Sequence, residues 1–321
     1  MRERWWRWLQ WAGGLLVLGF VVRFLVRNWA TIQTERIAWE LSPGWILASL
    51  ALVLATYALL VEAWRRMLGG WGVGSGGSGL GWPDAARIWV LSSLGKYLPG
   101  KIWALAGMAV LAKRRGVPPW TATASAVLLQ IISIGTGALL VAGTGVGPLE
   151  AHRPGSKVAL LIILLASLAA LLAVAWTPLA SKLLARFGVA SEGNREAGSG
   201  KRVSPEPGPV AFGIAANLAA WVVYGVALWA LARGVLPTAE LSLGEAIGAF
   251  AGSYLAGLLF LLAPGGLGVR EGVFMWMLQD RLGPANALAL AAVSRVGMTV
   301  ADVLAALPFV LTRGERADEP V

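Results

Sequence analysis

The sequence predicts an all-α, polytopic integral membrane protein with about six full transmembrane helices and two broken re-entrant hairpins in an inverted repeat. Three observations lead to this fold class. Of the 321 residues, 57% are hydrophobic and only 14% are charged, and the mean hydropathy is +0.68. Six apolar runs approach or reach the roughly 20 residues that cross a bilayer core. Two further apolar stretches are interrupted at mid-length by a proline-glycine step with basic residues beside it.

The full crossings are expected, in chain order, at residues 9–26, 45–63, 121–143, 158–177, 210–231 and 285–311. The first of them follows Arg2, Arg4 and Arg7, as the apolar core of a signal peptide would. Residues 26–29 contain no small residue at which a signal peptidase would cut, so we expect this segment to be a retained span.

The two broken stretches cover residues 85–112 and 244–282. Proline lacks the amide donor of a continuous helix, and glycine permits other backbone angles, so both stretches should unwind at the proline-glycine step. Unpaired backbone at membrane depth is tolerated only where protein or a water-filled cavity covers it. A matched pair of broken segments in two halves of a membrane protein therefore indicates a translocation site.

Basic residues in the connections favour hairpins over crossings. With both broken stretches as hairpins, sixteen basic residues lie on the side of the N-terminus and six on the other side, which predicts cytoplasmic termini. If the first stretch crossed instead, the cluster Lys113, Arg114 and Arg115 would lie outside. The hairpins then enter from opposite faces. Half-helices of ~12 residues reach ~18 Å, so their tips would meet near the midplane.

We expect one membrane domain over residues 1–321, made of two halves. Residues 1–180 form the first half, with the hairpin at 85–112, and residues 210–312 form the second, with the hairpin at 244–282. The polar stretch 181–209 is rich in Gly, Ser and Pro and is predicted to be a flexible cytoplasmic linker, and 313–321 is a short tail.

Composition excludes several classes of function. The chain has no cysteine and a single histidine, His152, so disulfides, thiolate chemistry and a histidine-based metal site are excluded, and no cofactor or metal is expected. The formal net charge of +10 comes from basic residues beside apolar spans, which indicates anionic lipid headgroups rather than nucleic acid as the partner. No catalytic arrangement of acidic residues with a nucleophile is present.

Ionisable residues at membrane depth are the candidates for a site. The predicted substrate-binding set is Lys96, Tyr97, Pro99, Gly100, Lys101, Pro264, Gly265, Gly266, Gly268, Arg270, Glu271, Arg295 and Asp302. The cations and the helix N-termini after each proline would form a positive site for an anionic headgroup or phosphate. The structural alternative is that these cations lie near lipid headgroups and the glycines serve helix packing.

Arg295 and Asp302 are seven residues apart, so they share one helix face but are separated by ~10.5 Å along it. Each therefore needs another partner, and Glu271 is the candidate for Arg295. Lys96 and Lys101 at the first break have no evident acidic partner in the sequence. The predicted ionic centre therefore lies around residues 264–271.

Two motifs, residues 95–103 and 264–272, resemble the lysylphosphatidylglycerol synthase transmembrane-region family of flippase-like membrane proteins, and Arg295 matches a position where that family tends to carry arginine. The resemblance implies a multi-pass protein of the bacterial or archaeal cytoplasmic membrane that moves, or helps to move, a phospholipid or lipid-linked anionic or aminoacylated headgroup between leaflets. It also implies the membrane module without the synthase domain. One departure is Gln130, where an ionic pair is expected in the span after the first hairpin.

Three functions remain open. The leading hypothesis is a flippase-like transporter, which is not an enzyme. The second is a membrane transferase acting on a lipid headgroup or lipid-linked sugar, with Glu271 or Asp302 as general base. The third is an accessory subunit of a separately encoded transferase, which co-purification would detect.

Overall fold

The computed structural model describes residues 39–73, 79–98, 102–144, 161–162, 165–169, 206–260, 266 and 268–312. Regular structure within these residues is helical throughout, as predicted. The elements, with η1 a 3₁₀ turn, are α2 (Pro43–Gly70), α3 (Trp82–Ser93), η1 (Leu94–Tyr97), α4 (Trp103–Lys113), α5 (Pro119–Thr144), α10 (Pro207–Val235), α11 (Leu243–Leu259), α12 (Val269–Leu282) and α13 (Pro284–Leu311).

Four helices, α2, α5, α10 and α13, are long and apolar enough to cross a membrane. They contain the predicted spans 45–63, 121–143, 210–231 and 285–311. A proline stands in the first turn of α2, α10 and α13, where its missing amide donor costs no helical hydrogen bond. Because α10 begins at Pro207, the last three residues of the predicted linker belong to that helix. The predicted span 9–26 and most of 158–177 lie outside the described residues.

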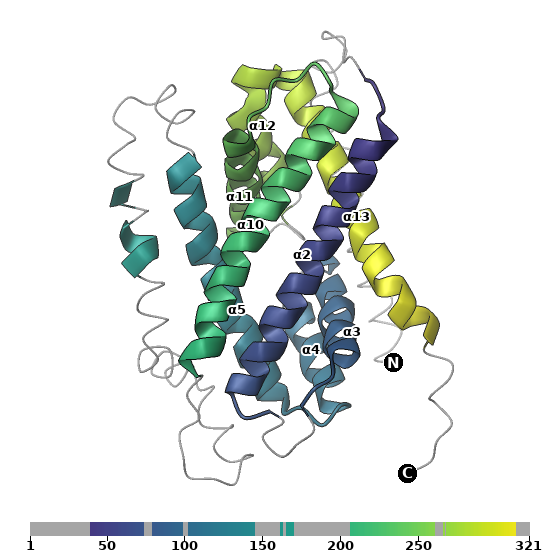
Figure 1. Cartoon of the computed structure of the whole chain (residues 1–321), viewed down its shortest axis with the longest axis vertical. Helices are drawn as coiled ribbons and strands as arrows, with labels where there is room; N and C mark the ends of the chain where they lie inside the picture. The colour runs from purple at the N-terminus through teal and green to yellow at the C-terminus, as the bar shows by residue number, and fades with distance from the viewer. Residues whose placement is uncertain are drawn as a thin grey trace, which may run out of the picture.

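The long helices α2 and α10 run antiparallel side by side (Figure 1). The amide of Ser42 before α2 donates to the carbonyl of Gly234 near the end of α10 at 2.9 Å, and the amide of Glu206 before α10 donates to the carbonyl of Gly70 at 3.3 Å. The two helices are therefore joined at both ends. The indole nitrogen of Trp221 then links α10 to α5 by donating to the carbonyl of Ser133 at 3.1 Å.

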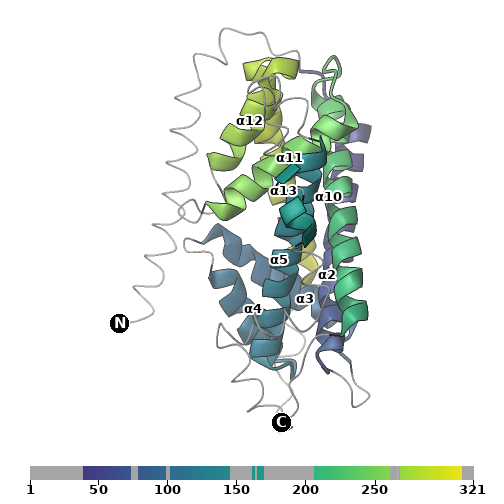
Figure 2. The same ribbon diagram turned by 90° about the vertical axis from the view of Figure 1, so that its left-hand side faces the viewer.

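Each predicted hairpin corresponds to two shorter helices packed on one another. The first broken pair is α3 with η1 and α4, and the second broken pair is α11 with α12. The two pairs lie toward opposite ends of the long helices (Figures 1 and 2). The chain leaves regular structure at Leu98 and at Phe260, both extended. Helix lengths thus follow one order twice: long, short, short, long.

Buried hydrophobic residues form two clusters, one around each broken pair. The cluster around the first pair is centred on Trp64 and Met67 of α2, and the cluster around the second pair on Phe250 of α11 and Phe274 of α12. The outer face of α13 instead exposes a row of valine and leucine side chains, namely Val296, Val300, Val303, Leu304 and Leu307. Such a face suits contact with lipid chains.

Candidate functional site

The carboxylate of Asp302 is the centre of a polar cluster in the apolar interior. Asp302 lies on α13 and is 3% exposed. Its Oδ2 accepts a hydrogen bond from Tyr97 Oη at 2.6 Å and lies 2.7 Å from Lys96 Nζ, while its Oδ1 accepts from Tyr57 Oη at 2.8 Å. These four residues, the Asp302 cluster, connect the first broken pair to α13 and to α2. The expectation that Lys96 lacks an acidic partner was therefore wrong.

The 3₁₀ turn η1 places Lys96 and Tyr97 against α13. It continues α3 at Leu94 and lies so close to α4 that a Cβ on Gly95 would meet the backbone nitrogen of Ala104 at 2.5 Å. Only glycine permits this approach without a shift of the backbone. The Lys96 side chain is 37% exposed, so the ammonium group reaches the buried carboxylate from an accessible position.

The second polar contact joins α12 to α13. Glu271 is buried in the first turn of α12, and its Oε2 accepts a hydrogen bond from the amide of Gly268 at 2.6 Å. Gly268 has φ +79°, which favours glycine because other residues rarely adopt that conformation. The other oxygen, Oε1, lies 3.6 Å from Nη1 of Arg295. The partner predicted for Arg295 is thus confirmed, and we call these two residues the Glu271 pair.

The glycines of the second motif also bring two backbones together. Gly266 has φ +72°, and a Cβ there would lie 2.7 Å from the Cα of Gly257 in α11. The backbone at Gly266 therefore rests directly on α11. Five of the predicted site residues lie outside the described residues, namely Pro99, Gly100, Lys101, Pro264 and Gly265.

Arg270 is buried beside this pair but faces different groups. Its guanidinium carbon lies 5.0 Å from the ring centroid of Phe250 and 5.5 Å from that of Tyr254, and Nη2 lies 3.3 Å from Sδ of Met298. Among the residues that the structure describes, no carboxylate lies within ion-pair distance of it. Cation-π contacts stabilise a buried guanidinium only in part, by ~2 kcal/mol or more when desolvated. Arg270 is therefore a buried cation without a carboxylate partner among the described residues.

The face of α13 that carries Arg295 and Asp302 serves both broken pairs. Arg295 contacts a carboxylate from the second pair and Asp302 contacts an ammonium from the first, so the two contacts have opposite polarity. Together with Arg270, the site contains three cations and two carboxylates in the described residues, a net charge of one positive.

Sequence reasoning included Tyr97 in the predicted site but missed the other three tyrosines. The chain has only four, and all are near these charges: Tyr57 and Tyr97 bind Asp302, while Tyr224 and Tyr254 stack with Phe250 beside Arg270. Tyrosine in the middle of an apolar span needs a partner for its hydroxyl group, so the presence of Tyr57 and Tyr224 in two spans was a usable signal. Thr299, which lies 3.4 Å from the Tyr97 hydroxyl, was missed as well.

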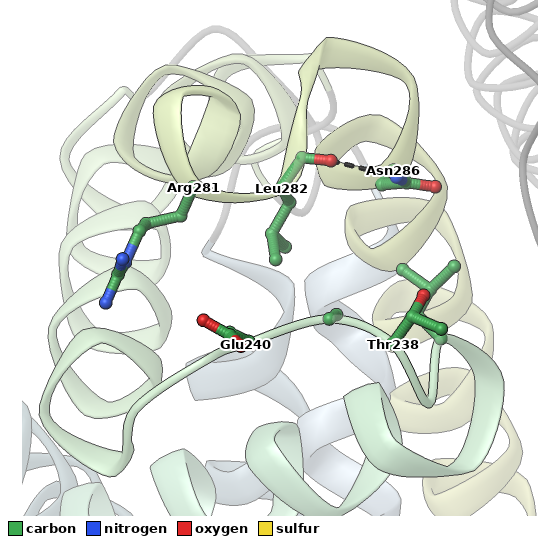
Figure 3. Close-up of a pocket in the computed structure, with 7 residues that line it drawn as sticks. Thr238, Glu240, Arg281, Leu282 and Asn286 are labelled. Carbon is green, nitrogen blue, oxygen red and sulfur yellow. Dashed lines mark hydrogen bonds between the residues drawn. The ribbon is translucent and has the colours of Figure 1, made fainter.

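Two surface hollows lie away from the charges. One, of about 390 Å³, is bounded by the α10–α11 connection and the α12–α13 turn (Figure 3). Figure 3 shows Arg281 across this hollow from Asn286, whose side-chain amide donates to the carbonyl of Leu282 at 2.9 Å. The other hollow, of about 400 Å³, contains Arg65 and Arg66 near the end of α2. Neither hollow is lined by a residue of the Asp302 cluster or of the Glu271 pair.

The chemistry of the site is that of ion pairing and hydrogen bonding. The described residues contain no group of three or more acidic or histidine side chains that could hold a metal ion.

No curated protein matches the chain. The model of one protein family, described as the lysylphosphatidylglycerol synthase TM region, matches residues 10–306. The match covers both broken pairs, the long helices α2, α5 and α10, and α13 as far as residue 306, and it agrees with the resemblance of the two motifs. The chain therefore belongs to the lysylphosphatidylglycerol synthase TM region family and is a membrane-embedded protein.

Proposed function

We propose that this protein moves, or helps to move, a phospholipid or lipid-linked molecule with an anionic or aminoacylated headgroup between the two leaflets of the bacterial or archaeal cytoplasmic membrane. One observation carries the proposal. Both broken helix pairs are joined to a single long helix, α13, through charged side chains inside an apolar protein. Family membership supports a role linked to lipids.

Stability alone does not explain these charges. Removing charged groups from water costs several kcal/mol per ion, and well-packed apolar residues often replace a buried ion pair at no loss of stability. Charged residues within membrane segments usually belong to a path for a substrate or an ion. The site has two ion pairs that can open and one further cation, Arg270, so it offers binding groups to a phosphate at each stage of transfer.

The arrangement of helices supports an inverted repeat. In this proposal α2, the first broken pair and α5 form one half, and α10, the second broken pair and α13 form the other. The broken pairs then enter the membrane as re-entrant hairpins from opposite faces, as their positions at opposite ends of the long helices suggest (Figure 2). The charge of the connections orients the termini toward the cytoplasm.

Headgroup transfer follows from competition between phosphate and carboxylate. A phosphate that binds Arg270 can also take Arg295 from Glu271, which frees the second broken pair from α13. A phosphate that binds Lys96 takes it from Asp302, which frees the first. Because each exchange replaces one anion by another, the cations keep a partner throughout, and the two faces of the membrane open in turn. No covalent step is required.

The test is exchange of labelled lipid in proteoliposomes. Glu271→Gln and Arg295→Ala should reduce exchange of an acyl-labelled phosphatidylglycerol to the rate of protein-free vesicles. Matched controls are Glu245→Gln and Arg281→Ala, which break a 2.8 Å ion pair between α11 and α12 at the exposed end of the same helices. These controls should exchange lipid at the rate of the unmodified protein, and all variants must elute as monodisperse protein.

Two results would contradict the proposal. Unchanged exchange in both Glu271→Gln and Arg295→Ala would remove these side chains from the lipid path. A headgroup-modified lipid that appears only in cells expressing the protein, with no change in its distribution between leaflets, would favour the transferase hypothesis. Transfer dependent on a co-purifying enzyme would favour the accessory role.

Topology is tested separately, and the absence of cysteine makes this direct. Single cysteines at Arg114, after α4, and Glu240, between α10 and α11, replace exposed side chains at opposite ends of the molecule. We expect a membrane-impermeant thiol reagent to label Glu240→Cys in intact cells and Arg114→Cys only after lysis. Labelling of both from the same side would overturn the inverted hairpins.

A further inference from the structure

The Asp302 carboxylate is surrounded by groups that donate hydrogen bonds. Three donors reach it within 2.8 Å, namely the hydroxyl groups of Tyr57 and Tyr97 and the ammonium group of Lys96. The carboxylate is 3% exposed, while Lys96 is 37% exposed. A buried carboxylate therefore has one accessible, charged neighbour whose position depends on the negative charge of Asp302.

The species that this carboxylate can exchange is a proton. A metal ion would need several oxygen ligands at roughly 2.0–2.6 Å, and the ammonium group of Lys96 occupies that space and repels a second cation. A proton needs only one oxygen lone pair. Protonation turns the carboxylate into a neutral carboxylic acid, which still accepts from a tyrosine hydroxyl but no longer binds the ammonium ion as an ion pair.

Other titratable and charged groups around Asp302 are few. On α13 itself, Arg295 lies two turns from Asp302. Helix α2 contributes Tyr57, whose hydroxyl group donates to Asp302. The hydroxyl groups of Tyr224 on α10 and Tyr254 on α11 interact with the cluster electrostatically at longer range. Asp84 and Arg87 lie in the first half of α3, remote from η1, and Asp84 pairs with Arg115 at 2.9 Å. On α12, which packs against α13, Glu271 pairs with Arg295, and Arg270 lies next to Glu271 in the chain. Arg281, in the last turn of α12, pairs with Glu245. Lys96 is therefore the charged group in contact with Asp302 among the described residues.

We propose that Asp302 is a proton-binding site that couples leaflet exchange to the proton gradient. This inference rests on the proposed function and adds its energy source. One proton from water adds to the Asp302 carboxylate and forms the acid, and Lys96 remains an ammonium ion. Lys96 then lacks its anion and takes the phosphate of the lipid headgroup in its place. When the proton leaves, the carboxylate recovers Lys96 and the phosphate is released.

The charges of the Lys96–Asp302 pair give the stoichiometry at this contact. With Asp302 ionised, its pair with Lys96 is neutral; with Asp302 protonated, the pair carries one positive charge, which one phosphodiester neutralises. Proton and monoanionic headgroup therefore bind together, one for one, and their joint transfer moves no net charge. A pH difference of about one unit, equivalent to ~1.4 kcal/mol, then supports up to a ~10-fold difference in the lipid between leaflets.

The test uses the full-length protein in phosphatidylcholine vesicles with a trace of acyl-labelled phosphatidylglycerol. With equal pH inside and outside, the proposed function requires the label to equilibrate. With a pH difference of one unit, the label should accumulate in the leaflet on the alkaline side, by up to ~10-fold. Protein orientation does not matter, because the stoichiometry sets the equilibrium. Protein-free vesicles measure passive redistribution.

The outcomes separate the two proposals. Equilibration at equal pH together with an unchanged distribution under the gradient overturns proton coupling and leaves the proposed function intact. Absence of exchange at equal pH overturns the proposed function itself. A second measurement needs no variant: binding of short-chain phosphatidylglycerol to detergent-purified protein should take up about one proton per headgroup, read with a pH indicator dye in weak buffer, and zero uptake contradicts the inference.

The matched variants are Asp302→Asn and Asp84→Asn. Asparagine at 302 cannot take up a proton, so both the accumulation and the proton uptake should be lost. Asp84→Asn makes the same chemical change in an ion pair outside the site and should retain both. Accumulation that persists in a folded Asp302→Asn variant would place the coupling elsewhere.

Discussion

Substituting Gly95 by alanine tests whether close packing of η1 on α4 positions the first half of the site. An added Cβ would lie 2.5 Å from the nitrogen of Ala104 and 2.8 Å from its Cα. Ordinary contact begins at about 3.4 Å, so the two segments must separate by up to about 0.9 Å. Both obstructing atoms belong to backbone, so no side-chain rotation relieves the overlap.

The expected cost follows from comparable overpacking in protein interiors, which destabilises by ~1–3 kcal/mol. The loss of glycine flexibility in the unfolded chain offsets up to ~1 kcal/mol of it. We therefore expect Gly95→Ala to lower the free energy of unfolding by about 1–2 kcal/mol. The shift also moves the neighbouring Lys96 and Tyr97 away from Asp302, so lipid exchange should fall together with stability.

Gly107→Ala is the matched control, because it lies in the same broken pair and its Cβ would meet only Ser92 at 3.6 Å. It should be neutral, or more stable by up to ~1 kcal/mol. The assay is thermal or denaturant unfolding of the detergent-purified protein, followed by exchange in vesicles. Equal unfolding free energies for Gly95→Ala and Gly107→Ala would refute the packing argument.

Three further variants test other contacts by the same unfolding assay. Tyr57→Phe removes the hydrogen bond to Asp302 Oδ1 and should lower the free energy of unfolding by about 1–2 kcal/mol. An unchanged free energy of unfolding would show that water replaces the tyrosine hydroxyl group. Trp221→Phe removes the indole donor that joins α10 to the backbone of α5 and leaves a space beside Gly137, so we expect a loss of at least about 1 kcal/mol. A stability equal to that of the unmodified protein would contradict this. Gly225→Ala places a Cβ 2.6 Å from the Cα of Ile247 and should cost about 1–3 kcal/mol, unless α10 and α11 separate freely.

The sequence predicted the long helices and the two breaks because both depend on local properties. Length and hydropathy locate a span, and proline and glycine locate an interruption, wherever the segment packs. The contact between Glu271 and Arg295 was also predictable, because Arg295 and Asp302 share a helix face at a spacing that prevents their pairing. Only a third group could then neutralise Arg295, and Glu271 is an acidic residue of the adjacent broken segment.

The contact between Lys96 and Asp302 was not predictable in this way, because it depends on how the first broken pair packs against a helix about 200 residues later. The expected partner was in the span after the first break, at Gln130. The structure shows Gln130 exposed on α5, so a carboxylate there would not lie in the protein interior. Local sequence locates a charge, but the packing of distant helices selects its partner.

The two series of helices, α2 to α5 and α10 to α13, are therefore alike in their order of lengths and unlike in chemistry. Helix α5, which ends the first series, contains no ionisable side chain, whereas α13, which ends the second, carries the partners for both broken pairs. A movement of α13 that lengthens one contact thus acts on the other through the same rigid helix. If the two contacts open in turn, α13 has two positions, and each contact favours one of them. A shared element with two positions is the physical requirement for coupling between the two contacts.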